Sequence, residues 1–102
     1  MVVQEISQDE CRLLVDECFK RDTEEQYRKT LSQLASSAHR TVIVDLTALD
    51  NLNSATIARL FWLRMKLLEK GRRLRVEGCT DTVFGILESL RMDAMMPVFR
   101  QT

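Results

Sequence analysis

The chain has 102 residues, of which 45% are hydrophobic and 29% are charged. This composition is typical of one folded domain with its own core, and it argues against a disordered chain. The 15 basic residues are balanced by 15 acidic ones. Because nucleic-acid-binding chains usually carry a basic excess, we expect no nucleic-acid partner.

The first residues and the cysteines indicate the cellular compartment of the protein. The opening MVVQEISQDE lacks the basic start and long apolar segment of a secretory signal. No run approaches the ~18 apolar residues of a membrane helix, so we expect no direct membrane insertion. Cys11, Cys18 and Cys79 form no CxxC pair. Three structural thiols in a reduced, cytoplasmic chain account for them best.

The first forty residues predict a β-hairpin followed by a helix. The hairpin covers 2–15, with short apolar strands at 2–6 and 11–15 around the turn-like segment SQDE. Thr23 is expected to cap the helix, because Gln26 three residues later completes a capping box. One face of this helix is apolar and carries Tyr27, Leu31, Leu34 and Ala35.

The rest of the chain alternates strands and helices. The apolar run 41–46 predicts a buried strand, and a helix follows from Asn53 or Ser54 to Gly71. The segment RRLRVEG, 72–78, predicts a strand, and Thr80 or Asp81 is expected to cap a third helix. The inner face of that helix carries Val83, Ile86, Leu87 and Leu90. The tail MMPVF adds a short helix or strand.

The element order is therefore β-β-α-β-α-β-α, which predicts an α/β fold. Strands that alternate with helices pair in parallel, and the hairpin adds an antiparallel strand. We expect residues 1–102 to form a single domain. Its mixed, mostly parallel sheet has about four strands, and the helices pack mainly on one face.

A serine lies at the expected start of the central helix. The first N–H groups of a helix have no internal partners, and the helix dipole places partial positive charge there. Ser54 can therefore serve as a plain cap. A phosphoserine at the same place would find backbone donors directed at it, so a cap controlled by phosphorylation is the alternative.

The stretch VIVDLTALDNLNSATIARL resembles the central signature of STAS domains, the family of anti-sigma-factor antagonists. Residues 45–48, Asp-Leu-Thr-Ala, correspond to the family's Asp-Leu-Ser-Gly. Residues 53–58 correspond to its Asp-Ser-Ser-Gly-Leu-Gly. The segment that begins at Lys70 is similar to the next unit of the family, so the likeness covers residues 41–99.

This resemblance implies that Ser54 is a phosphoacceptor, with Thr56 as second choice. In the family, a serine kinase that doubles as an anti-sigma factor modifies this position, and phosphorylation releases the partner. Asn53, Ala55 and Thr56 depart from the pattern, where the family has Asp, Ser and Gly. Asn53 thereby removes a negative charge beside the acceptor.

Other members of the family imply two alternatives. Some STAS subunits dock constitutively on the ATPase of ABC complexes that traffic phospholipids, and others are scaffolds of stress-signalling assemblies. An enzyme or ligand binder would need a pocket with convergent polar groups. The sequence has no such constellation, so we expect no enzymatic activity, no cofactor and no metal. His39, the single histidine, is expected in a solvated loop.

The helix after Ser54 is expected to extend the docking surface, in a protein that is a monomer or a weak dimer. Arg59, Trp62, Lys66 and Glu69 share one face, and an exposed tryptophan beside arginine suits an interface anchor. The alternative is that the helix is rotated or that Trp62 packs under the C-terminal tail. The inner side is assigned to Ile57, Leu60, Phe61, Leu67 and Leu68. The predicted partner-binding residues are Asn53, Ser54, Ala55, Thr56, Arg59, Trp62 and Lys66.

Overall fold

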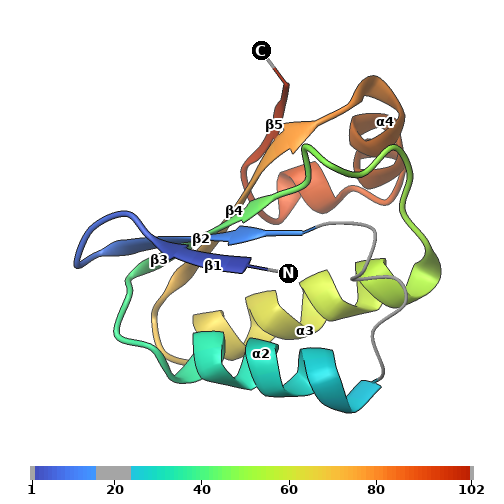
Figure 1. Cartoon of the computed structure of the whole chain (residues 1–102). Coiled ribbons are helices and arrows are strands. Elements are labelled where there is room, and N and C mark those ends of the chain that lie inside the picture. The colour runs from blue at the N-terminus through green and yellow to red at the C-terminus, as the bar shows by residue number, and fades with distance from the viewer. Residues whose placement is uncertain (1, 16–23, 102) are drawn as a thin grey trace.

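Five strands form one sheet in the order β1-β2-β3-β4-β5 (Figure 1). The computed structural model describes residues 2–15 and 24–101 of the chain. β1 and β2 are antiparallel, and the other neighbouring pairs are parallel. The strands are β1 (Val2–Glu5), β2 (Glu10–Leu14), β3 (Thr41–Asp45), β4 (Arg73–Cys79) and β5 (Val98–Arg100).

The helices lie between the strands as the alternating pattern predicts. They are α2 (Glu24–Ser36), α3 (Ser54–Leu68), α4 (Asp81–Ser89) and the short 3₁₀ helix η1 (Met92–Ala94). Thr80 caps α4, since its side chain accepts a hydrogen bond from Val83 N at 3.2 Å. The capping box expected at Thr23 lies outside the described residues.

The α/β fold class is confirmed, with one more strand than expected. β5 has three residues, and it joins the sheet where Val76 N donates to Pro97 O and Gln101 N donates to Cys79 O. In Figure 1, α2 and α3 lie beneath the sheet, and α4 lies beside β4 and β5. One hydrophobic core joins the sheet to all of the helices.

The core follows the alternation of the parallel strands. Cys11 pairs with Val42 and Val42 with Leu74, and one step further Val44 pairs with Val76. These residues face the helices. The largest side chains that are completely buried in this core include Leu13, Leu46, Leu49, Leu63, Leu67, Leu87 and Met92.

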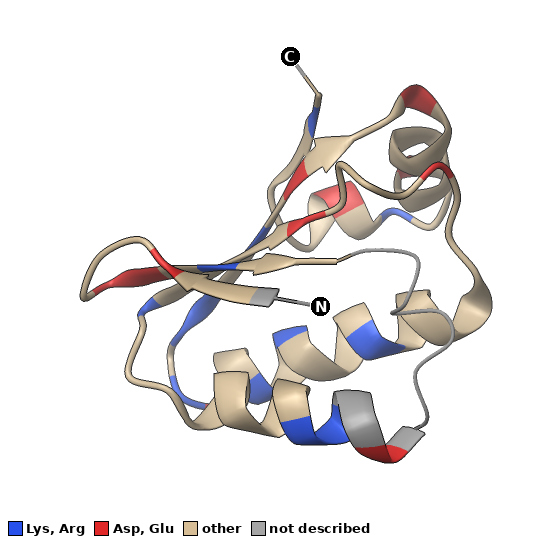
Figure 2. Ribbon diagram, viewed as in Figure 1, with Lys and Arg blue, Asp and Glu red and all other residues tan. Residues whose placement is uncertain are grey.

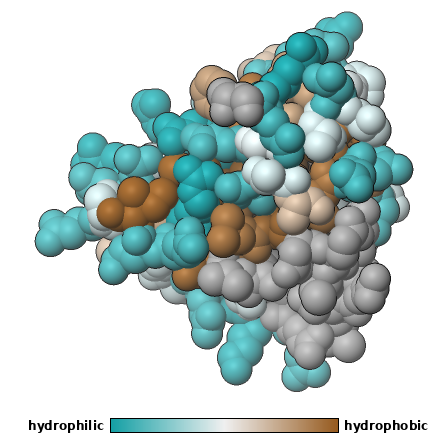
Figure 3. Space-filling view, turned by 45° about the horizontal axis from the view of Figure 1, so that its top comes forward, coloured by the Kyte–Doolittle hydropathy of each residue, from teal (hydrophilic) through white to brown (hydrophobic). Residues whose placement is uncertain are grey.

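The other face of the sheet is exposed to solvent and carries charged side chains. Ile43 lies between Arg12 and Arg75 in the register of the sheet, and it is only 1% exposed. The aliphatic stems of long basic side chains can cover an apolar residue while their charges stay in water. Figure 3 turns this face toward the viewer and shows mostly hydrophilic side chains with smaller hydrophobic patches between them.

A buried arginine closes the C-terminal end of α2. The guanidinium of Arg72 donates to the carbonyls of Leu34, Ala35 and His39, and burial lowers its pKa. The last carbonyls of a helix lack partners inside the helix, and a cation there also opposes the negative end of the dipole. His39, which we expected in a solvated loop, is half-buried, with Nε2 at 3.0 Å from Glu5 Oε1.

Candidate functional site

The loop between β3 and α3 carries the predicted site, and three leucines anchor it. Leu46 and Leu49 are completely buried, and Leu52 is nearly so. Leu49 N also donates to Leu46 O, which closes a turn. The loop therefore leads into α3 with its apolar side chains fixed in the core.

Asp45 fixes the start of the same loop. One carboxylate oxygen accepts hydrogen bonds from the backbone N–H of Thr47, at 2.9 Å, and from its hydroxyl. The other accepts from Arg12 Nη1 at 2.9 Å. Burial alone would raise the pKa of Asp45, but these hydrogen bonds and the charge of Arg12 outweigh it, so the pKa lies below its ordinary value.

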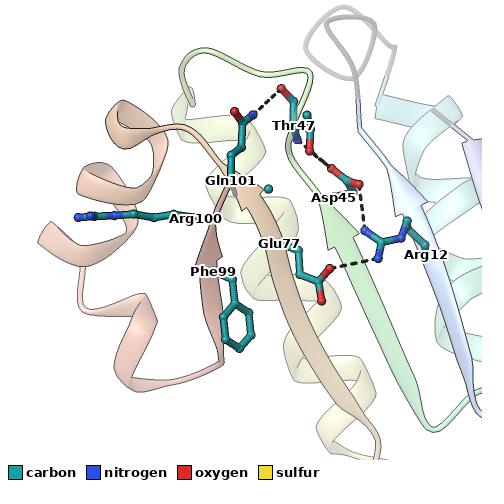
Figure 4. A pocket seen from close by; sticks show the side chains of 8 residues that line it. Arg12, Asp45, Thr47, Glu77, Phe99, Arg100 and Gln101 are labelled. Atoms are coloured by element: carbon teal, nitrogen blue, oxygen red, sulfur yellow. Dashed lines mark hydrogen bonds and ion pairs between the residues drawn. The ribbon is translucent and has the colours of Figure 1, made fainter.

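We call these contacts of Asp45 with Thr47 and Arg12 the clamp. A pocket of about 490 Å³ opens beside the clamp on the open face of the sheet (Figure 4). Arg12 links Asp45 to Glu77, to which Nη2 donates at 3.1 Å. Gln101 Nε2 donates to Thr47 O at 3.1 Å, which ties the C-terminal strand to the loop. Arg12, Asp45 and Glu77 are thus paired with one another, and they hold the start of the loop in place.

Asn53, not Ser54, caps α3. Asn53 Oδ1 accepts from the backbone N–H of Thr56 at 2.8 Å, which satisfies one of the donors at the helix start. Ser54 is the first residue of α3 and is exposed. Its hydroxyl makes no hydrogen bond to any of the residues described here. The serine is therefore accessible and does not serve as the cap.

The structure separates the predicted partner-binding residues into exposed and buried ones. Asn53, Ser54 and Ala55 are exposed at the start of α3. Thr56, the second candidate phosphoacceptor, is fully buried, and Arg59 is only 9% exposed. A folded chain therefore does not present the Thr56 hydroxyl to a kinase.

Two further predicted residues lie on the side of α3. Trp62 and Lys66 are half-buried, and Lys66 Nζ lies 5.8 Å from the centroid of the Trp62 ring. Trp62 also packs against the edge of the core. One part of the tryptophan is therefore packed against the core and another part remains accessible.

An apolar groove along α3 was missed from the sequence. Phe61 and Leu68 were assigned to the inner side, but they are 36% and 49% exposed, and Met65 between them is 51% exposed. The groove has a volume of about 770 Å³ and is lined mainly by Ala58, Phe61, Trp62, Met65, Leu68 and Met95. The sequence pattern could have indicated this groove, because a helix with apolar residues on two sides has two apolar surfaces to cover.

A comparison with known families decides the classification. The family model described as "Mlab, STAS domain" matches residues 2–97. The chain belongs to the STAS family. No curated protein matches the sequence significantly.

Two solved structures are similar to this STAS domain over almost its whole length. One belongs to work on the molecular architecture of the stressosome, described as a signal integration and transduction hub. Its TM-score is 0.79 at 16% identity, over 98% of this chain and 88% of the other. A second is RsbS from Moorella thermoacetica with a serine-to-glutamate substitution. Its TM-score is 0.77 at 14% identity, over 98% and 87%. At these identities the likeness shows the fold alone.

Neither a membrane-spanning helix nor a metal-binding cluster lies within residues 2–15 and 24–101. None of the helices there has the length and hydropathy needed to cross a bilayer. The same residues include no group of three or more His, Cys, Asp or Glu side chains placed to hold a metal ion.

Proposed function

We propose that this STAS domain is a non-enzymatic regulatory module that docks a protein partner through the surface around Ser54. The partner is a serine kinase of the anti-sigma-factor type, and phosphorylation of Ser54 controls docking. The observation that supports this proposal best is the exposed Ser54 hydroxyl at the first position of α3, with the capping role taken by Asn53.

Phosphorylation at this position would change the surface without unfolding the helix. A phosphate adds about −1.5 to −2 charges at neutral pH, and a helix start tolerates an anion well. The exposed Asp50 already places negative charge in the same loop. The apolar groove begins at Ala58, one turn after Ser54. A partner that covers both would lose affinity when a hydrated dianion is placed at its edge.

Intact-mass analysis tests the modification. The purified protein is incubated with ATP and an extract of the organism from which it comes. We expect the mass of one phosphate to be added to the wild type, and we expect no addition to Ser54→Ala. Ser32→Ala, which changes an exposed serine on α2, is the matched control and is expected to behave as the wild type. Phosphate that persists in Ser54→Ala would contradict the proposal.

A constitutive subunit is the second candidate, and the apolar groove favours it. Permanent interfaces are more hydrophobic than transient ones, and this groove exposes Phe61, Met65 and Leu68 together. In this case the partner is the ATPase of an ABC transporter of the phospholipid type, or a neighbour in a stress-signalling scaffold. Recovery of the same partner by Ser54→Ala and Ser54→Glu would support the constitutive role and contradict control by phosphorylation.

A further inference from the structure

A second cavity adjoins the apolar groove at the end of α3 that lies away from Ser54. Its volume is about 370 Å³, and three arginines line it: Arg64, Arg73 and Arg75. We call it the arginine pocket. Leu68 and Met95 line both cavities, and so does Arg64. The groove and the arginine pocket therefore adjoin each other.

Two of these arginines have no acidic partner among the residues that the structure describes. Arg75 is engaged, with Nε at 2.7 Å from Glu77 Oε2 and Nη2 at 3.6 Å from Glu10 Oε2. Arg64 Nε donates to Met95 O at 3.1 Å, and Arg73 is exposed. Among residues 2–15 and 24–101, no carboxylate pairs with either. Figure 2 shows basic segments where α3 ends and β4 begins.

We propose that the groove and the arginine pocket bind one amphipathic helix of the partner, with its apolar face on the groove and an acidic residue in the pocket. This inference rests on the proposed function, since it names the segment of the protein partner that docks beside Ser54.

The shape of the groove suits a helix. Phe61, Met65 and Leu68 recur at intervals of four and three residues, so they form one ridge along the exposed side of α3. A helix of 15 residues is about 22 Å long, which is enough to align three turns of a second helix. An amphipathic helix in a hydrophobic groove is a recurrent mode of peptide recognition.

The charge sets the chemistry and direction of that helix. A carboxylate entering between Arg64 and Arg73 would meet two guanidinium groups that have no acidic partner among the described residues, and such charge-assisted pairs are strong. The single acid that lines the groove, Glu69, lies 3.9 Å from Lys66. The acidic end of the partner helix therefore lies at the end of α3, and its other end lies toward Ser54.

Trp62 supplies the probe, because it is the single tryptophan of the chain and lines the groove. Two synthetic helical peptides with the same stripe of leucines are titrated against the full chain while its fluorescence is followed. One peptide ends in glutamates and the other ends in lysines. We expect the acidic peptide to bind at least about tenfold more tightly, a difference of about 1.4 kcal/mol. The preference should shrink with added salt.

Charge-reversal variants locate the contact. Arg73→Glu is expected to abolish the preference for the acidic peptide. Lys29→Glu, the same charge change at an exposed residue of α2, is expected to leave it intact. Met65→Glu is expected to weaken the binding of both peptides. All three positions are exposed, and equal melting temperatures would show that the variants remain folded.

Four outcomes would overturn the inference. The first is equal affinity for the two peptides, and the second is binding of neither. The third is a change of Trp62 fluorescence on titration with the fatty acid laurate but not with the acidic peptide. The fourth is a dimer of this chain that Met65→Glu dissociates. The third would assign the surface to a small anionic amphiphile, and the fourth to a second copy. If the partner still responds to Ser54 substitutions while the peptides show no preference, this inference fails and the proposed function stands.

Discussion

Asn53 Oδ1 accepts hydrogen bonds from both the backbone N–H and the hydroxyl of Thr56, at 2.8 and 2.9 Å. This relationship assigns different roles to three neighbouring residues. Asn53 caps α3 and Thr56 is buried beneath the cap, so Ser54 is left exposed between them. An Asp at the position of Asn53 could accept the same bond from the backbone N–H, so this departure from the family's pattern preserves the cap and removes a charge.

The cap can be tested by two substitutions at Asn53. We expect Asn53→Ala to lower the free energy of unfolding by about 1–2 kcal/mol, because the first turn loses an acceptor and the buried Thr56 hydroxyl loses its partner. Asn53→Asp keeps the acceptor and adds a favourable charge at the helix start, so it should be at least as stable as the wild type. Urea unfolding measures both. Equal stability of Asn53→Ala and the wild type would show that the cap contributes nothing.

Gly78 is expected to be the least replaceable glycine. Its φ is +74°, and an added Cβ would overlap Thr47 Oγ1 and lie 2.9 Å from Asp45 Oδ1. Gly78→Ala should therefore destabilise the protein by about 2–4 kcal/mol, from backbone strain and overpacking together.

The matched control for Gly78 lies on α4. An added Cβ at Gly85 meets nothing within 4 Å, and the residue is helical and exposed. Gly85→Ala should stabilise the protein by up to about 1 kcal/mol, because alanine favours helix. Thermal melting compares the two variants. A Gly78→Ala variant as stable as the wild type would contradict the described contact with the clamp.

The clamp at Asp45 predicts a dependence of stability on pH. The pKa of Asp45 is lowered in the folded chain, so its charged form stabilises the fold above the unfolded pKa of about 4, and this contribution is lost as the pH falls through the folded value. We expect Asp45→Asn to cost about 2 kcal/mol at neutral pH, the size of a hydrogen bond to a charged group. The difference between variant and wild type should shrink below pH 4.

The two proteins share all other carboxylates, so the contribution of these groups cancels when the free energies of unfolding are subtracted at each pH. Urea unfolding of both from pH 7 to pH 3 gives the difference directly. A difference that stays constant over this range, or grows toward acid, would show that the charge of Asp45 does not stabilise the folded chain.

The buried thiols should be inert in the folded state. Cys11 and Cys79 are 0% and 1% exposed, and burial raises both pKa values, that of Cys79 to about 11 with help from the charge of Asp45. Since the thiolate is the reactive form, a Cys18→Ser variant should react with a maleimide only as fast as it unfolds. Rapid stoichiometric labelling under native conditions would contradict the described burial.

Much of the fold was predictable because local signals agreed with the global arrangement. The β-branched run at 41–44 predicted the central strand, and the polar pairs 53–54 and 80–81 predicted the starts of two helices to within one residue. The sequence does not decide whether the tail forms a helix or the strand β5, because a strand of three residues is too short to show alternation. Only its pairing with β4 defines it.

The faces of α3 were harder to predict than its ends. Leucines, an isoleucine, a phenylalanine and a methionine surround most of this helix, so periodicity could not decide which of them face the sheet. Arg59 was placed outside and is buried, whereas Phe61 was placed inside and is exposed. The methionines of the tail divide in the same way, since Met92 and Met96 are buried and Met95 lines the groove.

The most direct test of the central claim is the affinity of a purified partner for three versions of this STAS domain. The partner is first captured from extract on the wild type and identified, and calorimetry then compares wild type, Ser54→Ala and Ser54→Glu. The account predicts that Ser54→Ala binds as the wild type does and that Ser54→Glu binds at least about tenfold more weakly, a loss of about 1.4 kcal/mol. Equal affinity of all three would contradict control at Ser54.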